Sequence, residues 1–425
     1  MKILQIASGD FFSTYGGGQV YVKNIVDEMI RQGLDVALLS FVVKDISINK
    51  CDYKGISLWE VGKQAEDTDI EELVHTISPN IIHAHSQKAL FATLGERLRI
   101  PVIVTAHHGG ILCQAGTLMN ADDLICQTTV SHEHCLRCCL ANIRTGRSWY
   151  PVMRLIPKDG YMRLGKTLQK LPFIPFVTPI GGAALSIQNK IAEWQTICNK
   201  ATKVITPSNA IAEAMCRNGL SLDKVEVIPH GIPKGIATEI EKKHDDKIRF
   251  FYVGRICRIK GLHILLEAFS GVADVDKVEL HIVGSAGNKG EQRYMEQLQR
   301  KCTSSNIVWH GKVAPDEVFA TIKDFDVMVH PTICLEVFGL NISESLAMNK
   351  PVLATRCGGA EMQIVDGVNG WLVAPNDVEA MREKMSEIVE QGIAMDVDTL
   401  HERVISIDEH VNDLLQVYEK ETLAN

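Results

Sequence analysis

Short apolar runs of strand length alternate with segments of helical periodicity along most of the chain. Residues 2–7 form the first apolar run, residues 20–30 place apolar side chains at helical spacing, and residues 36–39 form the next run. Residues 101–105 and 250–253 repeat the apolar pattern. Continuous apolar strands that alternate with helices are typical of a parallel sheet that is covered on both faces. The pattern therefore predicts an α/β fold whose ligands bind at the carboxyl ends of the strands.

A polar stretch near the middle divides this pattern in two. Residues 233–247 carry Glu, Lys and Asp in place of an apolar run, and a new strand begins at their end. We expect a Rossmann-like domain over residues 1–232, a linker over 233–247 and a second Rossmann-like domain over 248–405. Apolar side chains at helical spacing in residues 406–425 predict a last helix that crosses back to the first domain.

Two carboxylates bracket a Phe-Gly turn in the second half of the chain. An apolar run at residues 326–329 leads into a loop that carries Glu336, and the helical segment that follows carries Glu344. The first N–H groups of a helix lack partners within the helix, so a helix that starts after a strand favours an anion such as phosphate. The two carboxylates could face one ligand from two sides. The alternative is an ordinary strand-to-helix connection with a solvated Glu.

Cations follow the first strand of the second half. The strand at residues 248–253 runs into a loop with Arg255 and Lys260, and a helix comes next. Arg offers phosphate a fork of donors and Lys offers it a point charge, so both residues are candidates for a diphosphate clamp. Residues 16–18 form a Gly triplet between a strand and a helix near the N-terminus. That triplet is a weaker phosphate signal, because a flexible loop tip has the same composition.

Histidines mark strand ends in the first half. His85 follows one apolar run, and His107 follows another shortly before Gly109. A single such His is compatible with capping or packing. Several at the carboxyl ends of strands favour a functional site there.

Residues 109–180 are predicted to be an insertion rich in cysteine. Of the 12 cysteines of the chain, 5 lie between residues 113 and 139. The spacing of Cys135 and Cys138 is that of a metal knuckle, and Cys113 and Cys126 could complete four thiolate ligands. A structural zinc is the preferred interpretation, with an iron–sulfur cluster or free thiols as alternatives.

Composition narrows the class of protein. The 425 residues are 46% hydrophobic and 23% charged, which is ordinary for a soluble globular protein. The net charge of -8 argues against nucleic acid as a partner. No apolar run approaches the ~20 residues that cross a bilayer, and the N-terminus lacks a signal peptide, so we expect a cytoplasmic protein. Residues 150–180 mix basic and apolar side chains. They predict either peripheral contact with the inner face of the membrane, through anionic lipid or a lipid-linked substrate, or a solvated surface.

The motifs, taken in order, resemble a large family of retaining glycosyltransferases with the two-domain GT-B fold (glycosyltransferase family 4, glycosyl transferases group 1). The resemblance covers nearly the whole chain. It rests most strongly on Val253-Gly254-Arg255 with Lys260-Gly261, and on Glu336 and Glu344 with Phe338-Gly339-Leu340 between them. Weaker support comes from Tyr15-Gly16-Gly17-Gly18, Thr105-Ala106-His107, Pro229-His230-Gly231 and Gly358-Gly359. Val337, where the family often has Pro, and His108, where it often has Asp or Glu, are departures.

The resemblance implies a role for each matched residue. His107 and Glu336 would be catalytic, with His107 beside the anomeric carbon, and Glu344 would bind the ribose. The donor sugar would contact Glu336, Phe338 and Asn341. The donor diphosphate would be bound by Arg255, Lys260, Gly17, Gly18, Gly339 and Leu340.

The resemblance also implies the reaction. The enzyme, of the hexosyltransferase type, would move a sugar from a nucleoside-diphosphate sugar to a hydroxyl acceptor, which could be a glycan, a lipid-linked molecule or a small molecule. Polysaccharide or glycoconjugate biosynthesis would be its context, and catalysis would require no cofactor. Two alternatives remain open: another GT-B-type sugar-nucleotide enzyme, such as an inverting transferase or an epimerase, and a non-catalytic sugar-nucleotide-binding protein.

Overall fold

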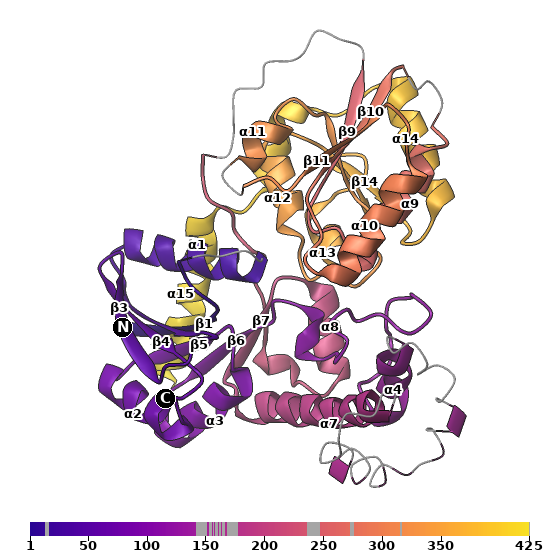
Figure 1. Cartoon of the computed structure of the whole chain (residues 1–425). Helices are drawn as coiled ribbons and strands as arrows, with labels where there is room; N and C mark the ends of the chain where they lie inside the picture. Colours follow the sequence, from indigo (N-terminus) through magenta and orange to yellow (C-terminus); the bar gives the residue numbers. More distant parts are fainter. Residues whose placement is uncertain are drawn as a thin grey trace. The chain divides into compact units, whose positions relative to one another are not determined.

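The computed structural model of the chain describes residues 1–12, 17–141, 177–235, 247–272, 276–314 and 317–424, with scattered residues of 151–167. The chain divides into two compact units, and each has its own sheet (Figure 1). The first unit comprises Met1–His230 and Ile407–Asn425, and the second comprises Gly231–Ser406. Most of the predicted linker and much of the predicted insertion lie outside the described residues.

The first unit contains an eight-stranded sheet with the strand order β3-β4-β2-β1-β5-β6-β7-β8. Neighbouring strands run parallel except for the hairpin of β3 and β4. The strands are β1 (Lys2–Ser8), β2 (Asp35–Phe41), β3 (Ile48–Tyr53), β4 (Ile56–Val61), β5 (Ile81–Ala84), β6 (Val102–Thr105), β7 (Lys203–Thr206) and β8 (Val225–Val227). Strands β5 and β6 are buried at every position, as their continuous apolar runs predict.

Helices cover this sheet, and one of them comes from the C-terminus of the chain. They are α1 (Gly17–Arg31), α2 (Asp67–Ile77), α3 (Lys88–Leu98), α4 (His132–Ala141), α7 (Val177–Lys200), α8 (Asn209–Arg217) and α15 (Ile407–Leu423). Val411, Leu414 and Tyr418 of α15 are fully buried in one cluster with Ile25 and Met29 of α1. The predicted return of the last helix to the first domain is therefore confirmed (Figure 1).

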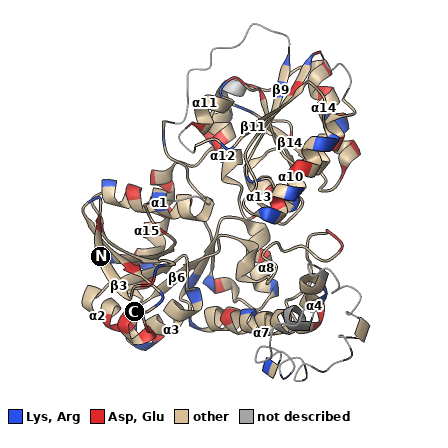
Figure 2. Cartoon of the chain, in the orientation of Figure 1, with Lys and Arg blue, Asp and Glu red and all other residues tan. Residues whose placement is uncertain are grey.

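The second unit contains a six-stranded parallel sheet with the order β11-β10-β9-β12-β13-β14. Its strands are β9 (Ile248–Val253), β10 (Val278–Val283), β11 (Ile307–Gly311), β12 (Val327–His330), β13 (Val352–Thr355) and β14 (Gly370–Val373). Its helices are α9 (Leu262–Phe269), α10 (Lys289–Lys301), α11 (Val318–Ile322), α12 (Leu340–Ala347), α13 (Gly359–Gln363) and α14 (Val378–Gln391). Charged residues are frequent along helices such as α10 and α14 (Figure 2).

The strand orders identify where ligands bind. In the second sheet the order reverses between β9 and β12, and in the first it reverses between β1 and β5. Open α/β sheets bind ligands in the crevice that opens at such a reversal, beyond the carboxyl ends of the strands. Arg255 and Lys260 follow β9, and Glu336 follows β12. In the first unit His85 follows β5 and His107 follows β6.

No described helix is long and apolar enough to cross a membrane. The basic and apolar stretch at residues 150–180, which predicts membrane contact, lies mostly outside the described residues.

Candidate functional site

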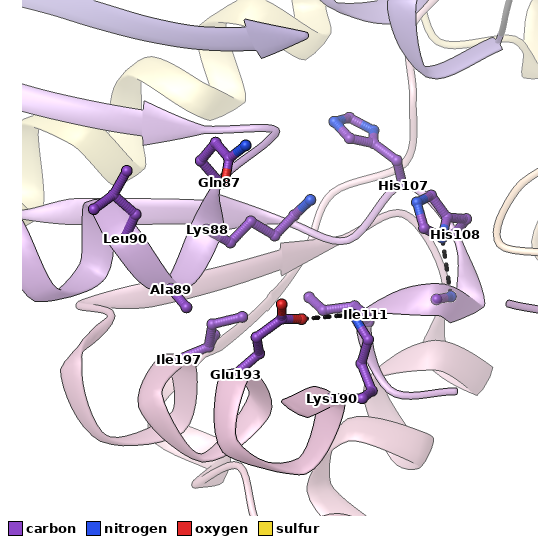
Figure 3. Close-up of a pocket in the computed structure, with 11 residues that line it drawn as sticks. Gln87, Lys88, Ala89, Leu90, His107, His108, Ile111, Lys190, Glu193 and Ile197 are labelled. Carbon is purple, nitrogen blue, oxygen red and sulfur yellow. Dashed lines mark hydrogen bonds and ion pairs between the residues drawn. The ribbon is translucent and has the colours of Figure 1, made fainter. Parts of the chain in front are cut away.

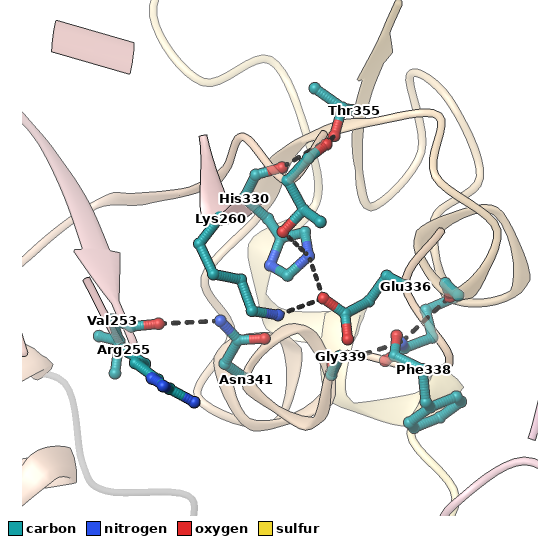
Figure 4. Close-up of polar contacts among 12 residues, drawn as sticks. Val253, Arg255, Lys260, His330, Glu336, Phe338, Gly339, Asn341 and Thr355 are labelled. Atoms are coloured by element: carbon teal, nitrogen blue, oxygen red, sulfur yellow. Dashed lines mark hydrogen bonds and ion pairs between the residues drawn. The ribbon is translucent and has the colours of Figure 1, made fainter. Parts of the chain in front are cut away.

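Lys260 reaches the loop after β12 because two loops of the second unit approach each other closely. It ends the short 3-10 helix Arg258–Lys260, and Gly261 follows with a φ of +70°. A Cβ at Gly261 would lie 1.7 Å from the carbonyl oxygen of Pro331, so only glycine permits this approach. As a result, the ammonium of Lys260 donates a hydrogen bond to the carboxylate of Glu336 (Figure 4).

The ion pair of Lys260 and Glu336 is largely removed from solvent. Their side chains are 29% and 16% exposed. Burial alone would lower the pKa of Lys260 and raise that of Glu336, but each charge stabilises the other, so the pKa of Lys260 is raised and that of Glu336 is lowered. Both groups are therefore charged at neutral pH. Two residues that resemblance assigns to the same donor molecule thus lie in direct contact.

His330, at the end of β12, lies against this pair. It was not among the candidate site residues predicted from the sequence. Its Nε2 lies 3.7 Å from Oε2 of Glu336 and 3.0 Å from Oγ1 of Thr332. Burial lowers the pKa of His330 to about 4, so its ring is neutral at neutral pH. The strand-end rule that singled out His85 and His107 applies to His330 as well.

The Phe-Gly turn is fixed by hydrogen bonds to two neighbouring loops. Glu336 bonds through its backbone to Cys357 and Gly359, in the loop after β13, over 2.8 and 2.9 Å. The side chain of Asn341 donates to the carbonyl oxygen of Val253, at the end of β9, over 2.9 Å. These bonds hold the turn, which contains Phe338 and Gly339 (Figure 4), at the carboxyl edge of the sheet, and α12 begins directly after it at Leu340.

Glu344 lies on α12, which is anchored by the buried side chains of Ile342 and Leu346. Burial raises the pKa of Glu344 to about 7. No other described residue makes a hydrogen bond or ion pair with its carboxylate. A desolvated carboxylate without a partner is unfavourable in the free protein and is typical of a ligand-binding position.

Arg255 is engaged by a different carboxylate. Its Nε lies 2.8 Å from Oε2 of Glu291 on α10, and one terminal nitrogen lies 2.5 Å from Oε1. The Arg255 side chain is 57% exposed. Both candidate cations for the diphosphate are thus paired with carboxylates in this structure, and Arg255 is the more accessible of the two.

In the first unit, His107 takes part in a buried chain of hydrogen bonds that ends on α15. His85 bonds through Nε2 to Oε1 of Gln5 over 2.8 Å, and His107 bonds through Nε2 to Nδ1 of His85 over 2.9 Å. The amide nitrogen of Gln5 donates to the hydroxyl of Tyr418 over 3.3 Å, and that hydroxyl contacts His83. The C-terminal helix therefore helps to hold His107.

This series of hydrogen bonds determines which ring nitrogens of His85 and His107 carry protons. Burial lowers the pKa of both His85 and His107 well below the usual value, so both rings are neutral. Because the amide oxygen of Gln5 can only accept, Nε2 of His85 carries its proton and Nδ1 accepts. His107 then donates from Nε2. Its buried Nδ1 is left as an acceptor without a hydrogen-bond partner among the described residues, which is typical of a functional group.

Two pockets of the first unit open beside His107. One, of about 190 Å³, is also lined by Gly18, Phe11 and His85. A Cβ at Gly18 would lie 3.6 Å from Cβ of His107, so the start of α1 and the end of β6 are neighbours. Gly17 is the first residue of α1 and is exposed, and Gly16 lies outside the described residues.

Comparison with known proteins relates the segment that carries these residues to a family. The model of the family described as glycosyl transferases group 1 matches residues 235–404, which include the Lys260–Glu336 pair and Glu344. The second unit therefore carries the segment that characterises the glycosyl transferases group 1 family. This confirms the resemblance that the motifs of the second half indicated.

Relatives and solved structures agree with this family. The chain is 27% identical over 230 residues to an uncharacterized glycosyltransferase, MJ1178, of Methanocaldococcus jannaschii, covering 53% of this chain and 62% of the relative. It is 31% identical over 153 residues to a D-inositol 3-phosphate glycosyltransferase of Corynebacterium urealyticum, covering 34% and 36%. The chain spans about half the length of the curated relatives that it matches.

The fold is shared along the whole chain. The structure of Anabaena Alr3699/HepE with UDP and glucose matches with a TM-score of 0.66 and 18% identity, covering 99% of both chains. The sucrose-phosphate synthase of Thermosynechococcus elongatus matches with a TM-score of 0.68 and 17% identity, covering 100% of both chains. The predicted GT-B fold is confirmed by these neighbours.

Several cysteines of the first unit form a cluster, but the described residues do not arrange the predicted zinc ligands as a metal site. Cys113, Cys126, Cys135 and Cys138 line one pocket of about 210 Å³ together with Cys139. Burial raises the pKa of Cys135 to about 11, which favours the thiol. Within the described ranges, no group of three or more His, Cys, Asp or Glu side chains is placed to hold a metal ion. Zinc binding by these thiols stays a prediction.

Proposed function

We propose that the chain is a retaining glycosyltransferase that moves a sugar from a nucleoside-diphosphate sugar to a hydroxyl acceptor. The observation that carries the proposal is the cluster at the reversal between β9 and β12. There a buried Lys–Glu pair, a helix N-terminus and the unpaired carboxylate of Glu344 occur within the segment that matches the family. Cations, N–H groups and carboxylates are the groups that a diphosphate joined to two sugars requires.

Each part of the donor has a chemically suited partner in this proposal. Glu344 accepts hydrogen bonds from the ribose hydroxyls, which supplies the partners that its carboxylate lacks. Lys260 and Arg255 bind the diphosphate together with the backbone of Gly17, Gly18, Gly339 and Leu340. Glu336, Phe338 and Asn341 contact the donor sugar. UDP-sugars are the first donors to test, because the Anabaena neighbour was solved with UDP and with UDP-glucose.

The reaction then consists mainly of departure of the leaving group. The bond between the anomeric carbon and the diphosphate oxygen breaks, and Lys260 and Arg255 stabilise the negative charge that develops on that oxygen. The acceptor hydroxyl attacks the face that the diphosphate has left, and its proton passes to the departing oxygen. Configuration is retained without a carboxylate nucleophile, and neutral His107 positions the transferred sugar. The transition state is expected to have oxocarbenium character.

The proposal is tested by the release of nucleoside diphosphate from a panel of sugar nucleotides, with glycan, lipid-linked and small-molecule acceptors. We expect release by the natural chain and its loss in Glu336→Ala and in Lys260→Ala. Glu379→Ala is the matched control, since Glu379 lies on α14 with a side chain that is 62% exposed and an ion pair to Arg382. Full turnover in both site variants would show that the site assignment is wrong. An inverted product would favour an inverting transferase, and binding without release would favour a non-catalytic binding protein.

The names of relatives suggest the biological context. They include a capsular polysaccharide biosynthesis glycosyltransferase of Staphylococcus aureus and a lipopolysaccharide 1,2-N-acetylglucosaminetransferase of Salmonella typhimurium. We propose that this chain likewise acts in polysaccharide or glycoconjugate biosynthesis, in the cytoplasm or at the inner face of the membrane.

A structural zinc is a separate proposal for the cysteine cluster. It is supported by the four thiols that share one pocket. We expect about one zinc per chain by elemental analysis, in keeping with a four-thiolate site, and its loss when Cys135→Ser and Cys138→Ser are combined. A metal-free natural chain that is equally stable with and without a chelator would reject zinc.

A further inference from the structure

The second pocket beside His107 has the properties of an anion site. It has a volume of about 360 Å³ and lies wholly within the first unit, between the start of α3, the loop after β6 and the helix α7. His107 and His108 line it on one side (Figure 3). Lys88 and Lys190 approach it from α3 and α7. The volume falls within the roughly 300–1,000 Å³ of small-molecule sites.

Lys88 is a half-buried cation that forms no ion pair with any described residue. Its ammonium donates one hydrogen bond, over 2.6 Å, to the carbonyl oxygen of His85. No carboxylate among the described residues forms an ion pair with it. Burial and the nearby charge of Lys190 lower the pKa of Lys88 to about 8, although the carboxylate of Glu193 opposes this change, so Lys88 still carries its charge at neutral pH. An ammonium offers three N–H donors, and a buried charge is stable only when it is paired, so an anion in the pocket would complete its environment.

The N-terminus of α3 favours the same sign of ligand charge. Gln87, the N-cap of α3, has a φ of 46° and its side chain does not cap the helix. The first N–H groups of this 11-residue helix are therefore available at Ala89 and Leu90, which line the pocket. Lys190 bonds to Glu193 over 2.7 Å, and that pair contributes no net charge. Lys88 and the helix N-terminus leave the pocket positive.

We propose that this pocket binds a phosphate or carboxylate group of the acceptor, which Lys88 and the N-terminus of α3 hold while the acceptor hydroxyl lies beside His107. The inference rests on the proposed function, because it assigns an acceptor class to the same site. Figure 3 shows the ammonium of Lys88 directed to the side of the pocket where His107 and His108 lie. An anionic group bound there would fix the orientation of a small polar acceptor. The hydroxyl groups of such an acceptor are alike and would not fix its orientation by themselves.

The test is direct binding to the full chain, measured by calorimetry without any donor. The probes are glucose 6-phosphate, inositol 1-phosphate and glucuronate, each compared with its neutral counterpart, and vesicles with and without phosphatidic acid. Soluble probes and vesicles distinguish a sugar acid or phosphate from a lipid phosphate. We expect at least one anionic probe to bind about 10- to 100-fold more tightly than its neutral counterpart, the range for a charge-assisted hydrogen bond.

Variants assign this preference to the pocket. Lys88→Met keeps the apolar stem and should abolish the preference for the anion, whereas Lys88→Arg should keep most of it. Lys200→Met is the matched control, because Lys200 is the last residue of α7, does not line the pocket and pairs with Glu96. Equal binding of charged and neutral probes, no binding of any anionic probe, or an unchanged preference in Lys88→Met would each overturn the inference. Anion binding by a chain that transfers sugar from no donor would refute the proposed function and leave the anion site standing.

Discussion

Glu344 offers a sharp test, because the same side chain should weaken the fold and support the function. Its side chain is half-buried on α12 and has no hydrogen-bond or ion-pair partner among the described residues, and desolvation raises its pKa from 4.5 to about 7. Glu344→Gln replaces the charge with a neutral group of the same shape. We expect the variant to be more stable than the natural chain at neutral pH and to bind nucleotide less tightly.

The size of the effect follows from the change in pKa on folding. At 1.36 kcal/mol per pKa unit, a rise from 4.5 to about 7 destabilises the folded state by about 3 kcal/mol once the carboxylate is ionised. Below pH 4.5 the carboxyl is protonated in both states, so the natural chain and the variant should be equally stable. Between pH 4.5 and 7 the unfolded state ionises first, and the advantage of the variant grows. Above pH 7 the advantage is constant.

Hydrogen exchange followed by mass spectrometry measures this difference within the second unit. Peptides from β12 and β13, compared at equal pH, should exchange on the order of 100-fold more slowly in Glu344→Gln at pH 7.5, the equivalent of about 3 kcal/mol. The two proteins should exchange alike near pH 4.5. An equal advantage at both pH values would refute the assignment to ionisation of Glu344, and no advantage at pH 7.5 would refute the burial of an unpaired charge.

The functional half of this prediction uses nucleoside diphosphate. The natural chain should lose affinity for it as the pH falls through 7, because a protonated Glu344 accepts fewer hydrogen bonds from ribose. Glu344→Gln should bind it about 10- to 100-fold more weakly at pH 8, the range for hydrogen bonds to a charged group. A variant that keeps full affinity would remove Glu344 from the ribose site.

Three further predictions concern the buried groups around the two sites. Burial lowers the pKa of His83 to about 3 and those of His330 and His410 to about 4. The unfolded state therefore binds protons below pH 6.5 while the folded state does not, so the free energy of unfolding, measured with urea, should fall between pH 6.5 and pH 5 by about 2 kcal/mol per histidine. Tyr418→Phe removes the hydroxyl next to Gln5 and His83 and should cost about 1–3 kcal/mol and lower turnover. Gly261→Ala should weaken nucleotide binding, because its Cβ cannot fit against Pro331. A free energy of unfolding that does not change with pH would contradict the first prediction. Unchanged turnover in Tyr418→Phe would contradict the second, and unchanged nucleotide affinity in Gly261→Ala would contradict the third.

The candidate residues of the second unit could be singled out in the sequence because their positions follow from simple rules. Arg255, Lys260 and Glu336 each lie in a loop that follows an apolar run, and the carboxyl ends of parallel strands meet at one edge. The contact between Lys260 and Glu336 was not predicted, because 76 residues separate them and each was assigned to the ligand instead. The close approach of the two loops at Gly261, which brings Lys260 to Glu336, is seen only in the structure.

The environment of His107 could not be read from the sequence. His85 and His107 were singled out as strand-end residues, but Gln5 lies in a continuous apolar run and Tyr418 lies over four hundred residues away on the last helix. Burial makes these polar groups depend on one another, and burial follows from packing rather than from local pattern. Lys88 was missed for the same reason, because an isolated Lys at the start of a helix is usually solvated.

The most direct test of the central claim is the transfer reaction itself. The purified chain is incubated with a panel of nucleoside-diphosphate sugars that begins with UDP-glucose, with anionic and neutral acceptors, and the anomeric configuration of the product is read by proton NMR. We predict release of nucleoside diphosphate with a product that keeps the configuration of the donor, and loss of both in Lys260→Ala. A product of inverted configuration, or no release from any donor, would contradict the account.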